Sequence, residues 1–457
     1  MNSPLQEWSL NMNIPMPVQI EKALSILIKS GFEAYIVGGC VRDILLSINP
    51  KDYDITTNAL PQQTLALFKN YHIIEKGLKH GTITVLIDNT PVEITTYRID
   101  GKYSDNRHPD DVSFTNNLRD DLSRRDFTIN AIAYNHQQGL IDYFEGRSDL
   151  EKKIIKCVGD PDKRFNEDAL RMLRALRFSS VLSFSIEQYT AQSIHNNKKL
   201  LNNIAIERIS NEFSMLICGE NSEAVIREFI GVFAVFIPEV LSMKNFEQNN
   251  IHHIYDVLNH TLKVVSNVPK VLHIKLAALF HDIAKPITYS TDEQGAGHFY
   301  GHQKKGAEMA QNILSRLKYD NCNIERVTKL VLYHDALIEL DEKIIKRWLN
   351  KLSEQVLREL ITLKKADTLA QNPQYHFRLN ELDKVIVLMD KIIDQNQCFS
   401  LKDLAINGYD LLKLGVPQDK LIGQILNHLL CAVIDGTLIN KKEVLMKEAS
   451  QYFNLDT

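Results

Sequence analysis

The stretch AYIVGGCVRDILLSINPKDYDITT, residues 34–57, decides how the N-terminal part of the chain folds. It predicts a strand over 34–37, a turn at Gly38-Gly39, a helix from about Val41, and a second short strand at YDIT, residues 53–56. Further strands are predicted downstream, at 82–87 and 92–96. The pattern therefore indicates a mixed α and β unit built around one sheet.

Two carboxylates of this stretch, Asp52 and Asp54, are the first candidate functional residues. Alternate residues of a strand point to the same face, so the two side chains would project together. Two such groups repel each other unless a cation lies between them, and Mg²⁺ prefers hard oxygen ligands. Taken alone, an Asp-x-Asp is more often a solvated loop or a cap. Its place after a strand, a glycine turn and a helix favours a magnesium site that supports nucleotidyl transfer.

The glycine turn indicates a phosphate site. The backbone of Gly38 and Gly39 can approach a triphosphate closely, and the following helix begins with its amide groups toward that anion. Arg42 would add a charge-assisted contact. A second basic segment, LSRRDFTINA at 122–131, offers Arg124 and Arg125 to triphosphate or ribose oxygens and Asn130 to a sugar hydroxyl. Each of these features has a plainer interpretation as a turn or a solvated face.

Composition limits the class of protein. The chain has 457 residues, 44% of them hydrophobic, and a formal net charge of −4, which argues against indiscriminate coating of nucleic acid. Its six cysteines form no CxxC pair, so neither a zinc knuckle nor a disulfide framework is expected. No secretory signal and no apolar run of membrane-spanning length is evident. We therefore expect a cytoplasmic protein that binds no membrane.

The motifs GGCVRDILL…KDYDIT, RRDFTINA and EDALRMLRALRF, in that order, resemble the class II tRNA nucleotidyltransferase and poly(A) polymerase family of the DNA polymerase β-like superfamily. The resemblance implies an α+β fold: a nucleotidyltransferase head with a mixed sheet at 1–150, an all-α neck at 151–230 for base recognition and RNA binding, an HD domain at 231–385 and a helical tail at 386–457.

The resemblance also assigns residues. It implies that Asp52 and Asp54 bind the catalytic metal, and that Arg124, Arg125 and Asp126 contact the ribose and phosphates of the nucleotide. A third carboxylate is common in the superfamily on a neighbouring strand, and Glu93 is the candidate here. The segment 142–146, DYFEG, resembles the hinge between head and neck.

Base selection is expected in the neck. Asp168 and Arg171, three positions apart, are predicted to share one helix face. A surface salt bridge is the plainer interpretation. The resemblance implies that this pair meets the Watson–Crick edge of the incoming base and accepts C and A. Arg174 and Arg177 follow Arg171 at intervals of three residues and would orient Asp168 or contact phosphate. The segment 206–213 resembles a supporting family motif, and the polar loop 103–109 is associated with addition of the terminal A.

A second candidate site lies in the middle of the chain. His260, His281-Asp282 and Asp367 resemble the H…HD…D pattern of the HD phosphohydrolase superfamily, which implies a bound transition metal. His302 and His334 match further histidines that would hold a second metal, and Lys285 completes an HDxxK pattern. A lone histidine is more often a core or surface residue, so only the ordered set supports this interpretation.

These inferences predict a CCA tRNA nucleotidyltransferase that uses CTP and ATP as substrates and the tRNA 3′ end as acceptor, with Mg²⁺ at the head. An A-adding enzyme or a poly(A) polymerase of the same family would share the motifs. A phosphohydrolase whose main activity lies at the HD site is the alternative of a different class. A non-catalytic RNA-binding protein would leave Asp52 and Asp54 idle.

Overall fold

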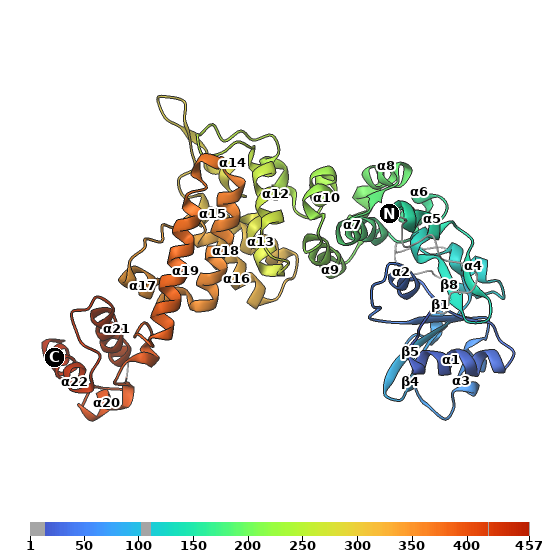
Figure 1. The fold of residues 1–457 in the computed structure, drawn as a ribbon, viewed down its shortest axis with the longest axis horizontal. Helices are drawn as coiled ribbons and strands as arrows, with labels where there is room; N and C mark the ends of the chain where they lie inside the picture. Colours follow the sequence, from blue (N-terminus) through green and yellow to red (C-terminus); the bar gives the residue numbers. More distant parts are fainter. Residues whose placement is uncertain (1–13, 102–110, 419, 457) are drawn as a thin grey trace. The chain divides into compact units, whose positions relative to one another are not determined.

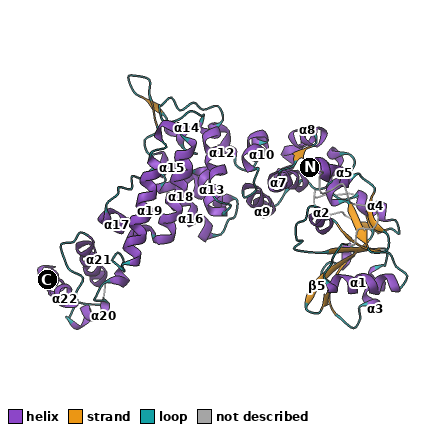
Figure 2. Ribbon diagram, viewed as in Figure 1, coloured by secondary structure: helices purple, strands orange, loops and turns teal. Residues whose placement is uncertain are grey.

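The structure is a computed structural model that describes residues 14–456, except 102–110 and 419. Its contacts divide the chain into two compact units, Met1–Leu241 and Ser242–Thr457, and each is described by itself (Figure 1). The first unit mixes strands with helices, and the second is almost entirely helical (Figure 2). No helix in the part of the chain that the structure describes is long and apolar enough to cross a membrane.

A seven-stranded mixed sheet organises the first unit, in the order β3-β4-β5-β2-β1-β8-β9. Strand β1 pairs antiparallel with β2 and β8, whereas β2 pairs parallel with β5. Every residue of β1 is buried, and β4 alternates buried with half-buried positions. The strands are β1 Ala34–Val37, β2 Asp54–Thr57, β3 His72–Ile74, β4 Thr82–Ile87, β5 Thr90–Thr96, β8 Ile132–Asn135 and β9 Gly139–Asp142.

Helices pack on this sheet through apolar faces. In α1 (Val18–Lys29) the buried residues Ile20, Ala23, Leu24 and Leu27 recur at helical spacing and meet β1 and β5. Helix α2 (Gly39–Leu45) begins directly after the glycine turn and contacts β1 and β8, while α3 (Pro61–Leu67) contacts β4. The strand–turn–helix–strand order predicted for residues 34–57 is confirmed.

The rest of the first unit contains short pieces and the neck helices. The short pieces are β6 Arg98–Asp100, β7 Val112–Phe114, α4 Leu118–Ser123 and α5 Gly146–Lys152. The neck helices are α6 Pro161–Glu167, α7 Leu170–Leu182, α8 Gln188–Asn197, α9 Ile206–Ile217, α10 Ser222–Glu228 and α11 Ile230–Phe233. Two short parallel strands, β10 Ile154–Ile155 and β11 Ser185–Ile186, interrupt the expected all-α neck.

One predicted helix boundary is wrong. Asp168 does not share a helix face with Arg171, because its backbone is extended, with φ −138° and ψ 104°, and α7 begins only at Leu170. The Asp168 carboxylate accepts a hydrogen bond from the amide of Leu170, 3.0 Å away. A short acidic side chain that satisfies a free amide at a helix start favours this non-helical conformation.

The second unit packs long helices around one another, with a hairpin of two short strands and a small helical module at its end. The helices are α12 Val257–Asn267, α13 Leu272–Phe280, α14 Lys285–Thr288, α15 His302–Arg316, α16 Asn321–Tyr333, α17 Glu342–Leu352, α18 Glu354–Ala370 and α19 Arg378–Asp394. The hairpin pairs β12 Ser290–Thr291 with β13 Gly297–His298. The module comprises α20 Gly408–Lys413, α21 Lys420–Ile434 and α22 Lys442–Asp456 around its own apolar core.

Candidate functional site

The sheet brings three carboxylates of the head together. The parallel pairing of β2 with β5 places Asp54 beside Glu93, and Asp52 lies two residues before Asp54. Burial raises the pKa of Asp54, Arg125 lowers it, and Asp52 raises it again. Burial, Asp54 and Asp52 all raise the pKa of Glu93. Three exposed carboxylates that repel one another where the two central strands pair suit a hard divalent cation.

The glycine turn lies against Arg125. Gly38 has φ +83°, a conformation that favours glycine, and a Cβ added there would lie 2.7 Å from Nη1 of Arg125, so the guanidinium would have to shift. Asp121, which is fully buried, lies 3.9 Å from Nη2 of Arg125. The Nε of Arg125 is buried and has no hydrogen-bond acceptor among the described residues. This arrangement leaves a donor available to an anion at the turn.

Asn130 and Asp126 do not face a free sugar site; their polar atoms bind other side chains. Asn130 accepts a 2.7 Å hydrogen bond from Nη1 of Arg42 and donates a 3.0 Å bond to Oδ1 of Asp126. Oδ2 of Asp126 accepts bonds from Nε and Nη2 of Arg174, at 2.9 and 2.7 Å. Burial raises the pKa of Asp126, but Arg174 and Asn130 outweigh it and hold that pKa far below its usual range.

The same chain of contacts continues into the neck. Arg177 reaches Glu212 of α9 at 3.2 Å, and Arg174 lies 3.8 Å from the same carboxylate. The Arg42, Arg174 and Arg177 guanidinium groups all lie near the ring of Phe178, between 4.2 and 5.5 Å from its centre. Of these neck arginines, Arg174 joins the neck to the head through Asp126, whereas Arg177 forms its ion pair within the neck.

The structure does not bring Asp168 and Arg171 into contact with each other. Oδ2 of Asp168 lies 3.1 Å from Nη2 of Arg208 on α9. Arg171 donates to Glu167 at 2.8 Å and to the backbone carbonyl of Arg124 at 3.0 Å. Each member of the pair is thus held by a different neighbour, and Arg171 is tied to the basic segment of the head.

Sequence reasoning missed three residues of this network as individual candidates: Asp121, Glu167 and Arg208. Asp121 lies three positions before Arg124 on α4 and receives its Nε at 3.0 Å, and the Thr56 hydroxyl donates to it at 3.1 Å. The i, i+3 spacing of Asp121 and Arg124 was a usable signal.

The loop 103–109, linked above with addition of the terminal A, lies outside the described residues.

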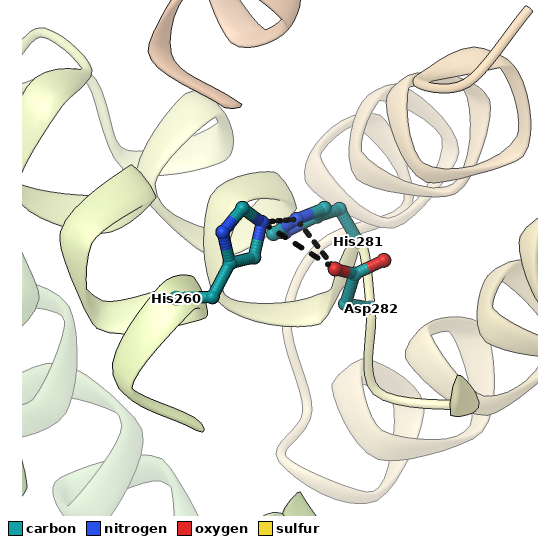
Figure 3. Close-up of side chains that lie close together, drawn as sticks. All are labelled: His260, His281 and Asp282. Atoms are coloured by element: carbon teal, nitrogen blue, oxygen red, sulfur yellow. Dashed lines mark hydrogen bonds and ion pairs between the residues drawn. The ribbon is translucent and has the colours of Figure 1, made fainter. Parts of the chain in front are cut away.

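The helical unit gathers a second cluster, in which four histidines and two aspartates converge. His260 belongs to α12 and Asp367 to α18, and His302 is the first residue of α15. His281 caps the C-terminal end of α13 and is followed by Asp282, and His334 caps that of α16. His260, His281 and Asp282 form one group whose ligand atoms lie within 4.8 Å of one another (Figure 3). Asp282, His302 and His334 form a second such group.

Backbone carbonyls fix the orientation of the four imidazole rings. The Nδ1 atoms of His281, His302 and His334 each lie 2.7 Å from a carbonyl oxygen, and Nδ1 of His260 lies 3.3 Å from that of Ala370. A ring whose Nδ1–H donates to a carbonyl keeps its lone pair on Nε2. All four Nε2 atoms point into the cluster, as the distances to Asp282 and Asp367 show.

The Asp282 carboxylate lies between the two groups. Its Oδ2 is 3.2 Å from His281, 3.5 Å from His260 and 2.7 Å from Nζ of Lys285. Its Oδ1 is 3.6 Å from both His302 and His334, and it is buried without a hydrogen-bond partner in the described part of the chain. Burial raises the pKa of Asp282, yet His281 and Lys285 outweigh it and hold that pKa well below the usual range.

This donor set fits cations. A buried oxygen without a partner and inward-facing imidazole nitrogens are costly unless an ion or water satisfies them. Imidazole with carboxylate suits first-row transition metals. The predicted ligands His260, His281, Asp282 and Asp367 do meet, with His302 and His334 beside them, and Asp282 belongs to both groups. Lys285 contacts Asp282 directly and so neutralises part of its charge.

Comparisons with known proteins cover most of the chain. Residues 34–156 match the Poly A polymerase head domain, residues 183–243 match the "Probable RNA and SrmB- binding site of polymerase A", and residues 290–449 match tRNA nucleotidyltransferase domain 2. The chain is 34% identical to a CCA-adding enzyme of Ligilactobacillus salivarius over 95% of this chain and 97% of that protein. It is 48% identical to one of Lactobacillus delbrueckii over 48% of this chain, a match spanning about half, 55%, of that relative's length.

Solved structures show the same fold. The CCA-adding enzyme of Bacillus stearothermophilus, in complex with CTP, is 26% identical and aligns over 96% of this chain and 99% of its own, with a TM-score of 0.70. The Thermotoga maritima CCA-adding enzyme complexed with tRNA is 20% identical with a TM-score of 0.61 over 95% of this chain and 94% of its own, which speaks for the fold alone. The α+β fold class expected from the sequence is confirmed.

The Asp126–Arg174 pair generates a stability prediction. Asp126→Asn should lower the free energy of unfolding of the first unit by about 1–3 kcal/mol, because Arg174 loses its charged partner. A carboxyl group whose pKa is lower in the folded than in the unfolded protein stabilises the folded state. That contribution is complete above the unfolded-state pKa of about 3.9. The difference between wild type and variant should therefore shrink by about 1.4 kcal/mol per pH unit below that value.

Urea unfolding monitored by amide exchange of peptides from 118–178 would measure this difference at pH 7, 4 and 3. Asp88→Asn serves as control, since Asp88 is exposed and only 3.7 Å from the exposed Lys22. Equal stability of wild type and Asp126→Asn at pH 7 would contradict the account.

Proposed function

The chain belongs to the CCA-adding enzyme family, and from that membership we propose that it builds or repairs the 3′-terminal C-C-A of tRNA from CTP and ATP. The observation that carries the proposal most directly is the pairing of Asp54 with Glu93 beside Asp52, next to the turn over which Arg125 lies. We place the reaction in the cytoplasm, consistent with six free cysteines. We further propose the division into head, neck, HD domain and tail at the boundaries expected from the sequence.

The proposed reaction is a phosphoryl substitution. The 3′-oxygen of the tRNA forms a bond to the α-phosphorus, the bond from that phosphorus to the bridging oxygen of the β-phosphate breaks, and pyrophosphate leaves with the electron pair. Asp52, Asp54 and Glu93 would hold Mg²⁺, which supplies activation of the hydroxyl and neutralisation of the leaving charge. Arg125, with its unpaired buried Nε, would bind the triphosphate above Gly38.

Asp126 and Asn130 have a structural part in this proposal. Their contacts with Arg42 and Arg174 fix the position of the basic segment that carries Arg124 and Arg125. We propose that they contribute to nucleotide binding by holding these cations in place, together with Arg177 through Glu212. Any direct contact with ribose would use atoms that now bind protein groups.

Selection of the base falls to Asp168 and Arg171. A carboxylate accepts from an exocyclic amino group, which C and A present on their pairing edges, and a guanidinium donates to the adjacent ring nitrogen. Both residues now bind protein partners, Asp168 through Arg208 and Arg171 through Glu167 and the carbonyl of Arg124. We propose that the incoming base takes over part of these contacts.

A second function is favoured by the cluster around Asp282. We propose that two transition-metal ions bind there, one with His260, His281, Asp282 and Asp367 and one with Asp282, His302 and His334, and that the site hydrolyses phosphoesters. Water would form a bond to phosphorus, the ester P–O bond would break, and the proton of water would pass to the leaving alcohol. The bound ions would supply a nucleophilic hydroxide. The relative that aligns over 95% of this chain is a CCA-adding enzyme, which favours CCA addition over a poly(A) polymerase.

Removal of one head carboxylate tests the transfer reaction. Asp54→Ala should lower the rate of ATP addition to tRNA ending in C-C by roughly 10³-fold, because a metal ligand worth several kcal/mol is lost. Asp88→Asn, which changes an exposed aspartate of the same unit to a residue that tolerates its φ of +49°, should keep the wild-type rate. Single-turnover labelling with ATP would measure both, and an active Asp54→Ala would overturn the assignment.

Nucleotide choice tests the neck pair. Asp168→Ala should raise incorporation of U or G relative to C and A by roughly 10- to 100-fold, since one hydrogen-bonded base contact is worth about 1–3 kcal/mol of discrimination. Competition among four labelled nucleotides would show it. An unchanged preference, with only a slower rate, would assign Asp168 to folding through Arg208 instead.

Metal content tests the second site independently of activity. Metal analysis after dialysis should give two ions per chain for wild type, one for His302→Ala and none for Asp282→Asn, since Asp282 belongs to both groups. His428→Ala, on the half-exposed side of the tail, should keep both ions. Binding by Asp282→Asn at the wild-type ratio would exclude the bridged arrangement.

A further inference from the structure

The ammonium group of Lys285 is enclosed beside the histidine–aspartate cluster. The residue is 5% exposed, and its Nζ lies 2.7 Å from Oδ2 of Asp282. A second acceptor, Oε1 of Gln248, is also 2.7 Å from Nζ, and Nε2 of His253 lies 3.4 Å away. An ammonium group has three N–H donors, so these three acceptors match it in number. The ring of Phe299 lies near as well, with its centre 5.2 Å from Nζ.

The amide of Gln248 is oriented with its oxygen toward this lysine. Gln248 is 2% exposed, and its Nε2 donates a 3.2 Å hydrogen bond to the backbone carbonyl of Tyr255. The amide nitrogen therefore has an acceptor and the amide oxygen has a donor, which rotation by half a turn would take from both. Because a buried polar group without a partner is costly, this orientation is favoured.

The hairpin of β12 and β13 holds the segment that carries Gln248. The amide of Gly297 donates to the carbonyl of Asn249 at 2.9 Å, and Nδ2 of Asn249 donates to the Tyr289 hydroxyl at 2.8 Å. A Cβ added at Gly297 would lie 2.3 Å from the backbone oxygen of Gln248, so the two backbones approach more closely than a side chain permits. Contacts outside the cluster therefore help to set the position of Gln248.

We infer that Gln248 and His253 are positioning residues of the histidine–aspartate cluster: they share the Lys285 ammonium and thereby keep a carboxylate oxygen accessible to a metal ion. That oxygen, Oδ2 of Asp282, lies 3.2 Å from Nε2 of His281. An ammonium whose only acceptor was Asp282 would be drawn to this oxygen and would compete with a cation for it. Two neutral acceptors divide its hydrogen bonds without adding negative charge. This inference rests on the metal binding proposed above for the cluster.

Co²⁺ titration of the full-length chain tests this positioning. The visible absorption of Co²⁺ responds to imidazole ligands, which the cluster offers and the carboxylates of the head do not. Gln248→Leu should weaken Co²⁺ binding at the cluster roughly 10-fold, the effect of one hydrogen bond to a charged group. His253→Phe should act in the same direction but less, since its contact is longer. Gln248→Glu should strengthen binding, because a second carboxylate would bind Lys285 and release Asp282.

A second background separates positioning from a merely structural role. In Lys285→Met, the further change Gln248→Leu should leave the Co²⁺ affinity unaltered, because the ammonium on which Gln248 acts is gone. Gln355→Leu is the matched control and should bind as wild type, since Gln355 is an exposed glutamine of α18. Equal losses from Gln248→Leu in both backgrounds, or weaker binding by Gln248→Glu, would overturn the inference.

The same titration distinguishes this inference from the function on which it rests. Absence of Co²⁺ binding at the wild-type cluster would remove the metal site and this inference with it. Unaltered binding by Gln248→Leu would overturn the inference and leave the metal site standing. Binding that depends on Gln248 only while Lys285 is present, without hydrolysis of phosphoesters, would support the inference and remove the hydrolase function.

Discussion

The buried carboxylate of Asp126 joins the head to the neck, beside the bond from Arg171 to the carbonyl of Arg124. It receives Arg174 from α7 through one oxygen and Asn130 through the other, and Asn130 in turn fixes Arg42 beside the glycine turn. A buried charge is stable only when it is paired and hydrogen-bonded. The positions of the head cations and of the neck helix are therefore not independent, and under the proposed function a nucleotide bound by the head cations would be presented to the neck helix.

The two candidate sites differ in how far their candidate metal ligands are exposed to solvent. In the head, the exposed carboxylates Asp52, Asp54 and Glu93 repel one another where the central strands β2 and β5 pair, which under the proposed function suits ions that arrive with a nucleotide and leave with pyrophosphate. In the helical unit, Asp282 and the four histidines of the cluster are at most 6% exposed, Asp367 is 20% exposed, and backbone carbonyls fix the imidazole rings. That arrangement suits ions that stay bound.

The sequence predicted the local elements of residues 34–57 because glycine and the hydrophobic period act over short distances. It named Glu93 only by resemblance, since the β2–β5 pairing that sets it beside Asp54 joins segments about forty residues apart. It placed Asp168 in a helix because spacing cannot reveal that its carboxylate satisfies the Leu170 amide instead. Glu167 was missed as the partner of Arg171 because ordinary surface pairs have the same i, i+4 spacing. Arg208 was missed as the partner of Asp168 because the two lie 40 residues apart in the sequence.

The central claim is that one head and one neck add C, C and A in order. The most direct measurement offers the wild-type protein a tRNA that ends at its discriminator base, with Mg²⁺, CTP and ATP together, and sequences the product ends. The account predicts two C residues followed by one A and then termination. Products that lack C, or that continue as a run of A, would contradict it.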